Sequence, residues 1–422
     1  MLNCIKSRVV CSYNNVLKQI TCVRGANNFR NMSIQIETEL QINSEPSLNS
    51  PNSKKRLRVD ENEDNAVKIQ KVDAVKIKRR PYALMMGYLG RDYYGMQINR
   101  GMKTIEDDLF NALLKNNFIT TENIENLRSF NFQRAARTDK GVSAARQVVS
   151  LKLPENVSKD SINDCLPNEI RVFGIKRVTK GFNSKINCSG RTYRYVIPTF
   201  AFAEEDMALL PSPEECDVEK RMKELLVIEG KPYNDFRLKP ETLEKINSFM
   251  KHFEGTHNFH NFTSKVKPLD PRAKRYIIKF QCVETFVSEN IEFAIIEIKG
   301  QSFMLHQIRK MISMVIAFLR NMATEDSLKQ TFKDEKMDIP LAPSLGLSLN
   351  YVHYDYYNAK YGSDGIHEPL DWKECEEEVE KFQTEYIMKH IVNTEVAEKT
   401  MLNWLASLPQ HSFSVREEPI AP

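Results

Sequence analysis

Short stretches of alternating apolar and polar residues recur between residues 81 and 299, with the period of a half-buried β-strand. In the stretch 146–153, for example, Val149, Leu151 and Leu153 alternate with polar residues. This alternation predicts a strand with one buried face. Similar patterns predict further strands at 81–90, 170–178, 191–198, 276–286 and 291–299.

Other segments space their apolar residues every three or four positions, as amphipathic helices do. Thr104 precedes one of them, and Asp107 lies three positions later, which predicts a capped helix that begins at residue 105. A second helix is predicted at 241–253. Residues 303–321 are apolar almost all round, which is typical of a buried core helix. Two more helices are predicted at 372–390 and 394–407.

Strands and helices mixed in this way, with hairpin-length connections, predict an α+β architecture with a largely antiparallel sheet. The chain divides into a first half at 81–235, a second half at 236–358 that repeats the same logic, and an acidic C-terminal helical extension at 359–422. Residues 37–80 are polar and carry little apolar periodicity, which predicts a disordered linker.

Length and composition exclude several classes of protein. A chain of 422 residues with 41% hydrophobic residues can build two to three structural units, so it is not disordered throughout. Its most apolar stretch, 311–319, is too short for a membrane span, which needs about 20 residues. The eight cysteines form no C-x-x-C pair. We therefore expect no zinc ribbon, no metal site, and reduced thiols in an intracellular protein.

Charge is distributed unevenly along the chain. Residues 1–36 contain five basic side chains and no acid, which resembles a mitochondrial targeting segment, although an untargeted tail has the same composition. Basic clusters at 54–58 and 76–80 indicate nuclear import, a nucleic-acid contact or simply a solvated surface. From 81 to 200 there are 18 basic and 11 acidic residues, whereas 364–399 has 4 and 11. A polyanion would therefore bind the first region and avoid the second.

The densest polar cluster surrounds Asp139, which lies among Arg134, Arg137, Lys140 and Arg146. Cations within a few ångströms keep a carboxylate ionised, which suits a nucleophile, and they also attract phosphate. Taken by itself, however, Thr-Asp-x-Gly is ordinary turn chemistry. The residues alone leave both interpretations open, with the structural turn favoured.

Six ordered segments resemble the tRNA pseudouridine synthase A family, in particular its eukaryotic nuclear and mitochondrial branch. The central one is RTDKGV, which begins at Arg137. The others are GYLGRDYYGMQ (87–97), FNSKINCSGRTYRYVIP (182–198), GTHNFHNFT (255–263), GQSFMLHQIRKM (300–311) and APSLGLSLNYV (342–352). The resemblance extends over about 81–414. Ser344 departs from the pattern, because the family usually has glycine there, and we expect a local change only.

The resemblance implies a role for individual residues. Asp139 would be the catalytic aspartate, and Arg309 would pair with its carboxylate and keep it ionised. Tyr193 would stack on the target base and could move a proton. Arg137 would help to extrude the base. The remaining residues expected to bind the substrate are Arg134, Thr138, Lys140 and Leu347.

The resemblance also implies a fold, a substrate and a place in the cell. The fold is two pseudo-symmetric α+β halves that share a mostly antiparallel central sheet. The substrate is uridine in tRNA, in the anticodon stem and loop region, with small nuclear and messenger RNA as further candidates. Isomerisation involves no redox change, so we expect no cofactor. We also expect a monomer located in the nucleus and the mitochondrion.

Two rival functions and two ambiguous clusters remain at this stage. The rivals are a non-catalytic RNA-binding protein on the same fold and an interaction protein that works through its C-terminal helices. His257 and His260 have the spacing of metal ligands, but their aromatic neighbours favour a packed loop. The tyrosines at 351–357 could stack on bases, and we interpret them first as packing at a strand edge.

Overall fold

One large sheet organises residues 78–416, the part of the chain that the computed structural model describes. Within that part it has nine strands, in the order β4-β1-β3-β11-β5-β10-β9-β8, with β2 added to β3. Their bounds are β1 (Arg79–Tyr88), β2 (Gln133–Arg134), β3 (Ser143–Pro154), β4 (Ile170–Arg177), β5 (Gly190–Pro198), β8 (Gly255–Asn258), β9 (Lys274–Ser288), β10 (Ile291–Gly300) and β11 (Leu347–His353).

All pairs in this sheet are antiparallel except the contact of β11 with β3, which is parallel. The predicted α+β class with a mostly antiparallel sheet is therefore confirmed. The predicted targeting segment (1–36) and nearly all of the predicted linker (37–80) lie outside the described residues. The boundaries at 235/236 and 358/359 stay predictions.

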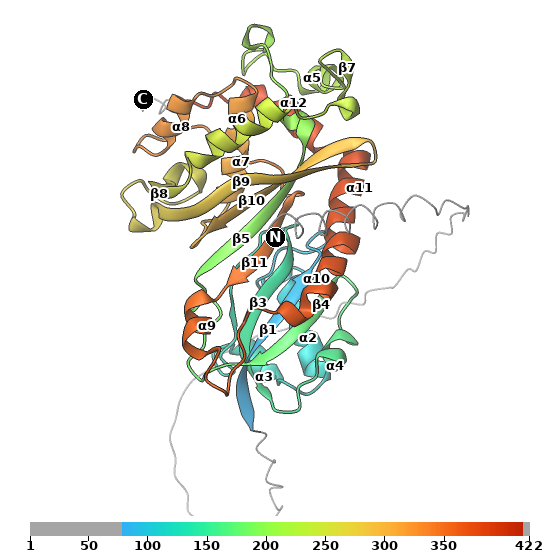
Figure 1. Cartoon of the computed structure of the whole chain (residues 1–422), viewed down its shortest axis with the longest axis vertical. Helices are drawn as coiled ribbons and strands as arrows, with labels where there is room; N and C mark the ends of the chain where they lie inside the picture. The colour runs from blue at the N-terminus through green and yellow to red at the C-terminus, as the bar shows by residue number, and fades with distance from the viewer. Residues whose placement is uncertain (1–77, 417–422) are drawn as a thin grey trace, which may run out of the picture. The chain divides into compact units, whose positions relative to one another are not determined.

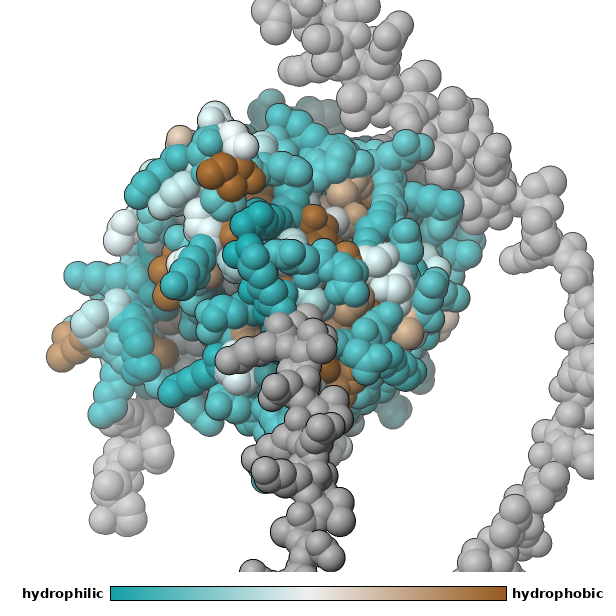
Figure 2. Space-filling model, turned by 90° about the horizontal axis from the view of Figure 1, so that it is seen from below, coloured by the Kyte–Doolittle hydropathy of each residue, from teal (hydrophilic) through white to brown (hydrophobic). Residues whose placement is uncertain are grey.

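Helices cover the sheet (Figure 1). Their bounds are α2 (Ile105–Lys115), α3 (Thr121–Glu125), α4 (Lys159–Asn163), α5 (Val218–Glu224), α6 (Pro240–Lys251), α7 (Gln307–Leu319), α8 (Glu325–Thr331), α9 (Asp355–Tyr361), α10 (Glu376–Phe382), α11 (Lys389–Glu398) and α12 (Thr400–Ser407). Among the described residues, no helix is both long and apolar enough to cross a bilayer. Figure 2 looks onto the end of the molecule that carries α9, where the surface is mostly hydrophilic with a few apolar residues.

The predicted N-cap of α2 is confirmed. The Thr104 hydroxyl accepts a hydrogen bond from the backbone N–H of Asp107, and the Asp107 carboxylate accepts one from the backbone N–H of Thr104. This reciprocal pair satisfies two N–H groups that have no partner inside the helix. Below the cap, α2 turns Ile105, Leu109 and Leu113 into the core.

The predicted core helix at 303–321 is α7, which begins later, at Gln307. It follows His306, whose φ of 66° is left-handed and interrupts the helical path. Inside the molecule α7 packs on α6, where the rings of Phe318 and Phe249 are stacked with centroids 3.8 Å apart. The four residues that precede α7 are thus free to line a cavity.

Three predictions about the fold were wrong. Strand β3 is buried on both faces, because the loop after β4 covers the polar side and the backbone N–H of Ser184 donates to Ser150 Oγ (3.0 Å). In the C-terminal extension, α10, the π-helical segment Gln383–Met388 and α11 form one continuous helix, and the break comes at Lys399, with φ of 49°. Finally, β11, which carries Tyr351, is an interior strand and not an edge.

The prediction that His257 and His260 lie in a packed loop is only partly right, because both pack against protein groups but His257 belongs to strand β8 and His260 to the 3-10 turn that follows it. His257 Nε2 bonds the Glu254 carbonyl oxygen (2.8 Å), and its ring stacks on Phe332 with centroids 4.3 Å apart. His260 is buried. Within the described part of the chain, no group of three histidine, cysteine, aspartate or glutamate side chains is arranged to hold a metal ion.

Candidate active site

A cavity of about 560 Å³ lies where the loop before β3 meets the middle of β5, the start of β11 and the start of α7. Its volume falls inside the range of roughly 300–1,000 Å³ that is usual for ligand sites. Of the eight residues predicted to form the site, seven line it: Arg134, Arg137, Thr138, Asp139, Tyr193, Arg309 and Leu347. The eighth, Lys140, is exposed outside it, with Nζ 4.3 Å from the centre of the Tyr94 ring.

The register of three strands brings these distant parts of the chain together. Leu349 of β11 pairs with Ala144 of β3 on one side and with Tyr193 of β5 on the other. Asp139 lies five residues before Ala144 in the loop that leads into β3. The row formed by these strand residues therefore places the aspartate loop and the tyrosine on the same cavity.

The segment 87–97 holds the aspartate loop in place. Tyr88 OH and Thr138 Oγ1 are hydrogen-bonded (2.9 Å), and the backbone N–H of Met96 donates to the Thr138 carbonyl oxygen (3.2 Å). Gly95 has φ of +101°, and a Cβ there would lie 2.6 Å from that same oxygen. Only glycine fits this approach without moving the loop that presents Asp139.

Asp139 is half-buried, and burial raises its pKa above the ordinary value. The charges of His306 and Arg309 act in the opposite direction. A carboxylate that has lost part of its hydration is a better base and nucleophile, while the cations keep the ionised form accessible. The arrangement suits a carboxylate that attacks or removes a proton.

Arg309 acts on Asp139 from a distance. Its Nε donates to the Ala342 carbonyl oxygen (2.6 Å), and among the ion pairs of the described residues none joins it to Asp139 within 4.0 Å. The direct pairing that the resemblance implies stays a prediction.

Tyr193 forms an aromatic wall of the cavity. Its side chain is buried and packs edge-to-face on Phe303, with ring centroids 5.2 Å apart. Burial raises the pKa of Tyr193 to about 12, and the charge of Asp139 adds to this, although Arg191 opposes it. The phenol is therefore neutral at physiological pH. It offers a ring face and an O–H group.

Arg191 is a cavity residue that the sequence reasoning missed. Its Nη2 donates to the Ala135 carbonyl oxygen (2.6 Å) and its Nη1 to the Gln301 carbonyl oxygen (2.9 Å). It is buried, and no carboxylate of the described residues lies within 4.0 Å of it, so its charge is not neutralised by an ion pair. Its place two residues before Tyr193, on one side of a strand, was a signal that could have found it.

The cavity is strongly cationic. Its only carboxylate is Asp139, against six basic side chains: Arg134, Arg137, Lys185, Arg191, Arg275 and Arg309. Of these, Lys185 and Arg275, like Arg191, were not expected from the sequence. Arg134 is ion-paired with Glu106, so the other five charges would concentrate a polyanion around one carboxylate.

Arg134 is already engaged by the protein. Its guanidinium forms a two-pronged ion pair with Glu106, with Nη2 3.0 Å from Oε2 and a second bond from Nε to Oε1. The Glu106 side chain is fully buried and also accepts from the backbone N–H of Ile98 (2.9 Å). This pair explains the presence of an arginine here without RNA, and the RNA contact predicted for Arg134 stays a prediction.

Leu347 closes the cavity from the side of β11. Its backbone N–H donates to the Ser344 carbonyl oxygen (3.0 Å), so a tight turn leads into the strand. Ser344, which departs from the family pattern, has its Oγ 3.7 Å from the position a Cβ on Gly141 would occupy. The departure therefore lies beside the aspartate loop.

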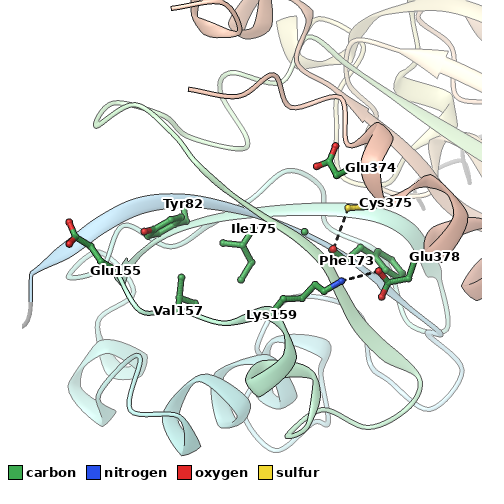
Figure 3. A pocket seen from close by; sticks show the side chains of 10 residues that line it. Tyr82, Glu155, Val157, Lys159, Phe173, Ile175, Glu374, Cys375 and Glu378 are labelled. Carbon is green, nitrogen blue, oxygen red and sulfur yellow. Dashed lines mark hydrogen bonds and ion pairs between the residues drawn. The ribbon is translucent and has the colours of Figure 1, made fainter. Parts of the chain in front are cut away.

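A separate hollow, on the outer side of the sheet, is lined mainly by acidic instead of basic side chains (Figure 3). It lies along the edge strand β4, where Cys375 Sγ donates to the Phe173 carbonyl oxygen (3.3 Å). Glu155, Glu374 and Glu378 line it, and its one basic residue, Lys159, is paired with Glu378 (3.0 Å). A polyanion would be repelled there, so the Asp139 cavity remains the candidate site.

Comparison with known proteins shows which family the chain resembles. A family profile described as tRNA pseudouridine synthase matches residues 249–355. The chain is 47% identical over 344 residues to a pseudouridylate synthase 1 homolog of Mus musculus, covering 80% of this chain and 76% of that one. It is 48% identical over 336 residues to the Homo sapiens homolog, with 78% and 73% covered. A tRNA pseudouridine synthase 1 of Yarrowia lipolytica is 34% identical over 385 residues, with 76% and 72% covered.

Proposed function

The chain belongs to the tRNA pseudouridine synthase family, and we propose that it isomerises uridine in tRNA to pseudouridine in the cavity that contains Asp139. The observation that carries this proposal is the cavity itself. It has a single half-buried carboxylate, six basic side chains and a buried neutral tyrosine. The reaction needs these three features, because a polyanionic substrate must bind, expose one base and present it to a carboxylate.

Each residue then has a defined task. The reaction breaks the bond from ribose to the ring nitrogen, turns the base, and joins the ribose to ring carbon 5; carbon 5 then loses its proton, and the freed ring nitrogen gains one. Asp139 attacks the substrate or removes a proton, and Arg309 stabilises its ionised form. Tyr193 stacks on the extruded base, and Arg137, exposed at the cavity mouth, takes its place in the RNA.

The proposal also covers the substrates, the oligomeric state and the location of the protein, which rest on its family membership. The substrate uridines lie in the anticodon stem and loop region, and small nuclear and messenger RNA are further substrates. The protein acts as a monomer in the nucleus and the mitochondrion, where the acid-free segment 1–36 and the basic clusters would direct it. Its two halves are pseudo-symmetric, which the parallel contact between β3 and β11 at the middle of the sheet supports.

Tritium release tests the function directly. A tRNA transcript labelled with tritium at uridine carbon 5 should lose its label to wild-type protein and to Asp326→Ala, which removes an exposed carboxylate on α8 that does not line the cavity. Asp139→Ala should release none while still binding the transcript. Binding without release by the wild type, over a panel of transcripts, would instead support the non-catalytic RNA-binding protein.

A further inference from the structure

A second cavity of about 540 Å³ adjoins the one that contains Asp139. It lies between α9 and the start of β5, and its wall includes Ile186, Gln301, Tyr356 and Lys360. Two pairs of consecutive residues are divided between the cavities. Lys185 and Ser302 line the first, whereas their neighbours Ile186 and Gln301 line the second.

Arg191 forms the partition between the two cavities. Its Nη1 donates to the Gln301 carbonyl oxygen (2.9 Å), and its Nη2 lies 3.5 Å from the Lys185 carbonyl oxygen. The same guanidinium lines the first cavity. The two cavities are therefore neighbours, with the Arg191 side chain and the backbone that it holds between them.

The second cavity presents large apolar surface to solvent. The Tyr356 side chain is 81% exposed and Ile186 is 77% exposed, although the next residue, Tyr357, is buried. Both residues line the same cavity, so they offer an exposed aromatic ring and an exposed aliphatic side chain to a bound molecule.

The polar groups of this cavity suit a nucleotide. Lys360 lies beside it, with Nζ 5.2 Å from the centre of the Tyr361 ring, and no carboxylate lines it. The nearest acid in sequence, Asp355, accepts a hydrogen bond from Ser189 Oγ (3.0 Å). Within the described residues, no hydrogen bond occupies the side-chain amide of Gln301, which is exposed.

We propose that this second cavity binds a nucleotide of the substrate RNA adjacent to the target uridine, with its base stacked on Tyr356 and its phosphate near Lys360. The inference rests on the proposed function. Extrusion of one base leaves its neighbours without a stacking partner, and an exposed tyrosine receives any base because every base has a π-face. Because Arg191 contacts the backbone of both cavities, this receiving surface adjoins the cavity proposed for the target base.

Binding of a tRNA transcript to the full-length chain tests the proposal. Tyr356→Ala should weaken binding roughly 5- to 150-fold, while Tyr356→Phe, which keeps the ring, should bind like the wild type. Loss of stacking should leave the salt slope of binding unchanged, whereas Lys360→Ala should reduce it by about one. The control Leu209→Ala removes an equally exposed apolar residue (78%) far from both cavities and should change nothing.

An abasic scan then identifies the nucleotide. Transcripts that lack one base at a time near the target should bind wild type more weakly at the stacked position only, and Tyr356→Ala should cause no further loss there. Equal binding by Tyr356→Ala and wild type would overturn the inference and leave the surface to a protein partner. Tritium release tests the proposed function separately from this inference. If wild type releases tritium and Asp139→Ala does not, the proposed function is upheld, whether or not Tyr356→Ala weakens binding.

Discussion

Arg134→Ala should destabilise the protein much more than it weakens RNA binding. The substitution removes the partner of Glu106, whose side chain is fully buried and keeps only the N–H of Ile98 as a neighbour at 2.9 Å. Removal of one member of a buried ion pair costs about 3–5 kcal/mol, because the other charge stays buried without compensation. Coulomb's law gives a consistent upper value, about 5.5 kcal/mol for charges 3.0 Å apart at an effective dielectric constant of 20.

The size of this penalty should depend on pH in a defined direction. Burial raises the pKa of Glu106 above its ordinary value, and the charge of Arg134 lowers it. Without Arg134 the folded-state pKa rises further, and a carboxyl whose folded-state pKa is raised loses stability as the pH increases through that pKa. The difference from wild type should therefore be largest at neutral pH and shrink on acidification.

Thermal unfolding and salt-dependent binding measure the two effects separately. For a unit the size of residues 78–416, a loss of 3–5 kcal/mol lowers Tm by roughly 4–7 °C. Adding Glu106→Gln to Arg134→Ala removes the unpaired charge and should recover most of the lost stability.

Lys140→Ala, at an exposed site, should leave Tm unchanged but lower the salt slope of tRNA binding by about one. A wild-type Tm for Arg134→Ala, together with a reduced salt slope, would refute this reasoning and place Arg134 on a phosphate.

Two further predictions concern the aspartate loop. Gly95→Ala should lower turnover at least tenfold, because its Cβ would meet the Thr138 carbonyl oxygen at 2.6 Å. The control Gly101→Ala is also at positive φ but has open space around it, so it should cost only about 1 kcal/mol of stability. Equal turnover in both variants would contradict this. Arg309→Ala should move the acid limb of the kcat/KM profile to higher pH, since it removes a charge that lowers the pKa of Asp139. Arg309→Lys should return the acid limb to its wild-type pH. An acid limb that stays in place in Arg309→Ala would show that Arg309 does not act on that carboxylate.

Much of the fold could be predicted from local patterns. The capped start of α2 at Ile105 and the long strands β9 and β10 follow from residue chemistry at short range. The wrong predictions concern burial and helix length, which depend on contacts with segments distant in the sequence. The polar side of β3 is buried because another segment covers Ser150, and the C-terminal helix continues to Glu398 through a π-helical segment. Both outcomes are set by tertiary packing.

In the candidate site, too, local patterns predicted some features and missed those that depend on distant contacts. From the residues alone, a structural turn was the favoured interpretation of Asp139, and only the resemblance to a family selected it as the nucleophile. Glu106 lies in the first turn of α2, where acids usually sit for the helix dipole, so nothing in the sequence indicated that it is buried against Arg134. Arg191 could have been found from its alternation with Tyr193. Two of its carbonyl partners, Ala135 and Gln301, could not, because they lie 56 and 110 residues away.

The position of the cavity follows from the one parallel contact in the sheet. Strands β3 and β11 share only two register pairs, Ser143 with Ser348 and Ala144 with Leu349. The aspartate loop leads into the first of these strands, and Leu349 also pairs with Tyr193. Because a slip of one residue would turn alternate side chains to the other face, the distance between carboxylate and ring depends on this short register. Bonds that cross the contact, such as Arg146 Nη1 to the Asn350 carbonyl oxygen (3.3 Å), therefore stabilise the site as well as the sheet.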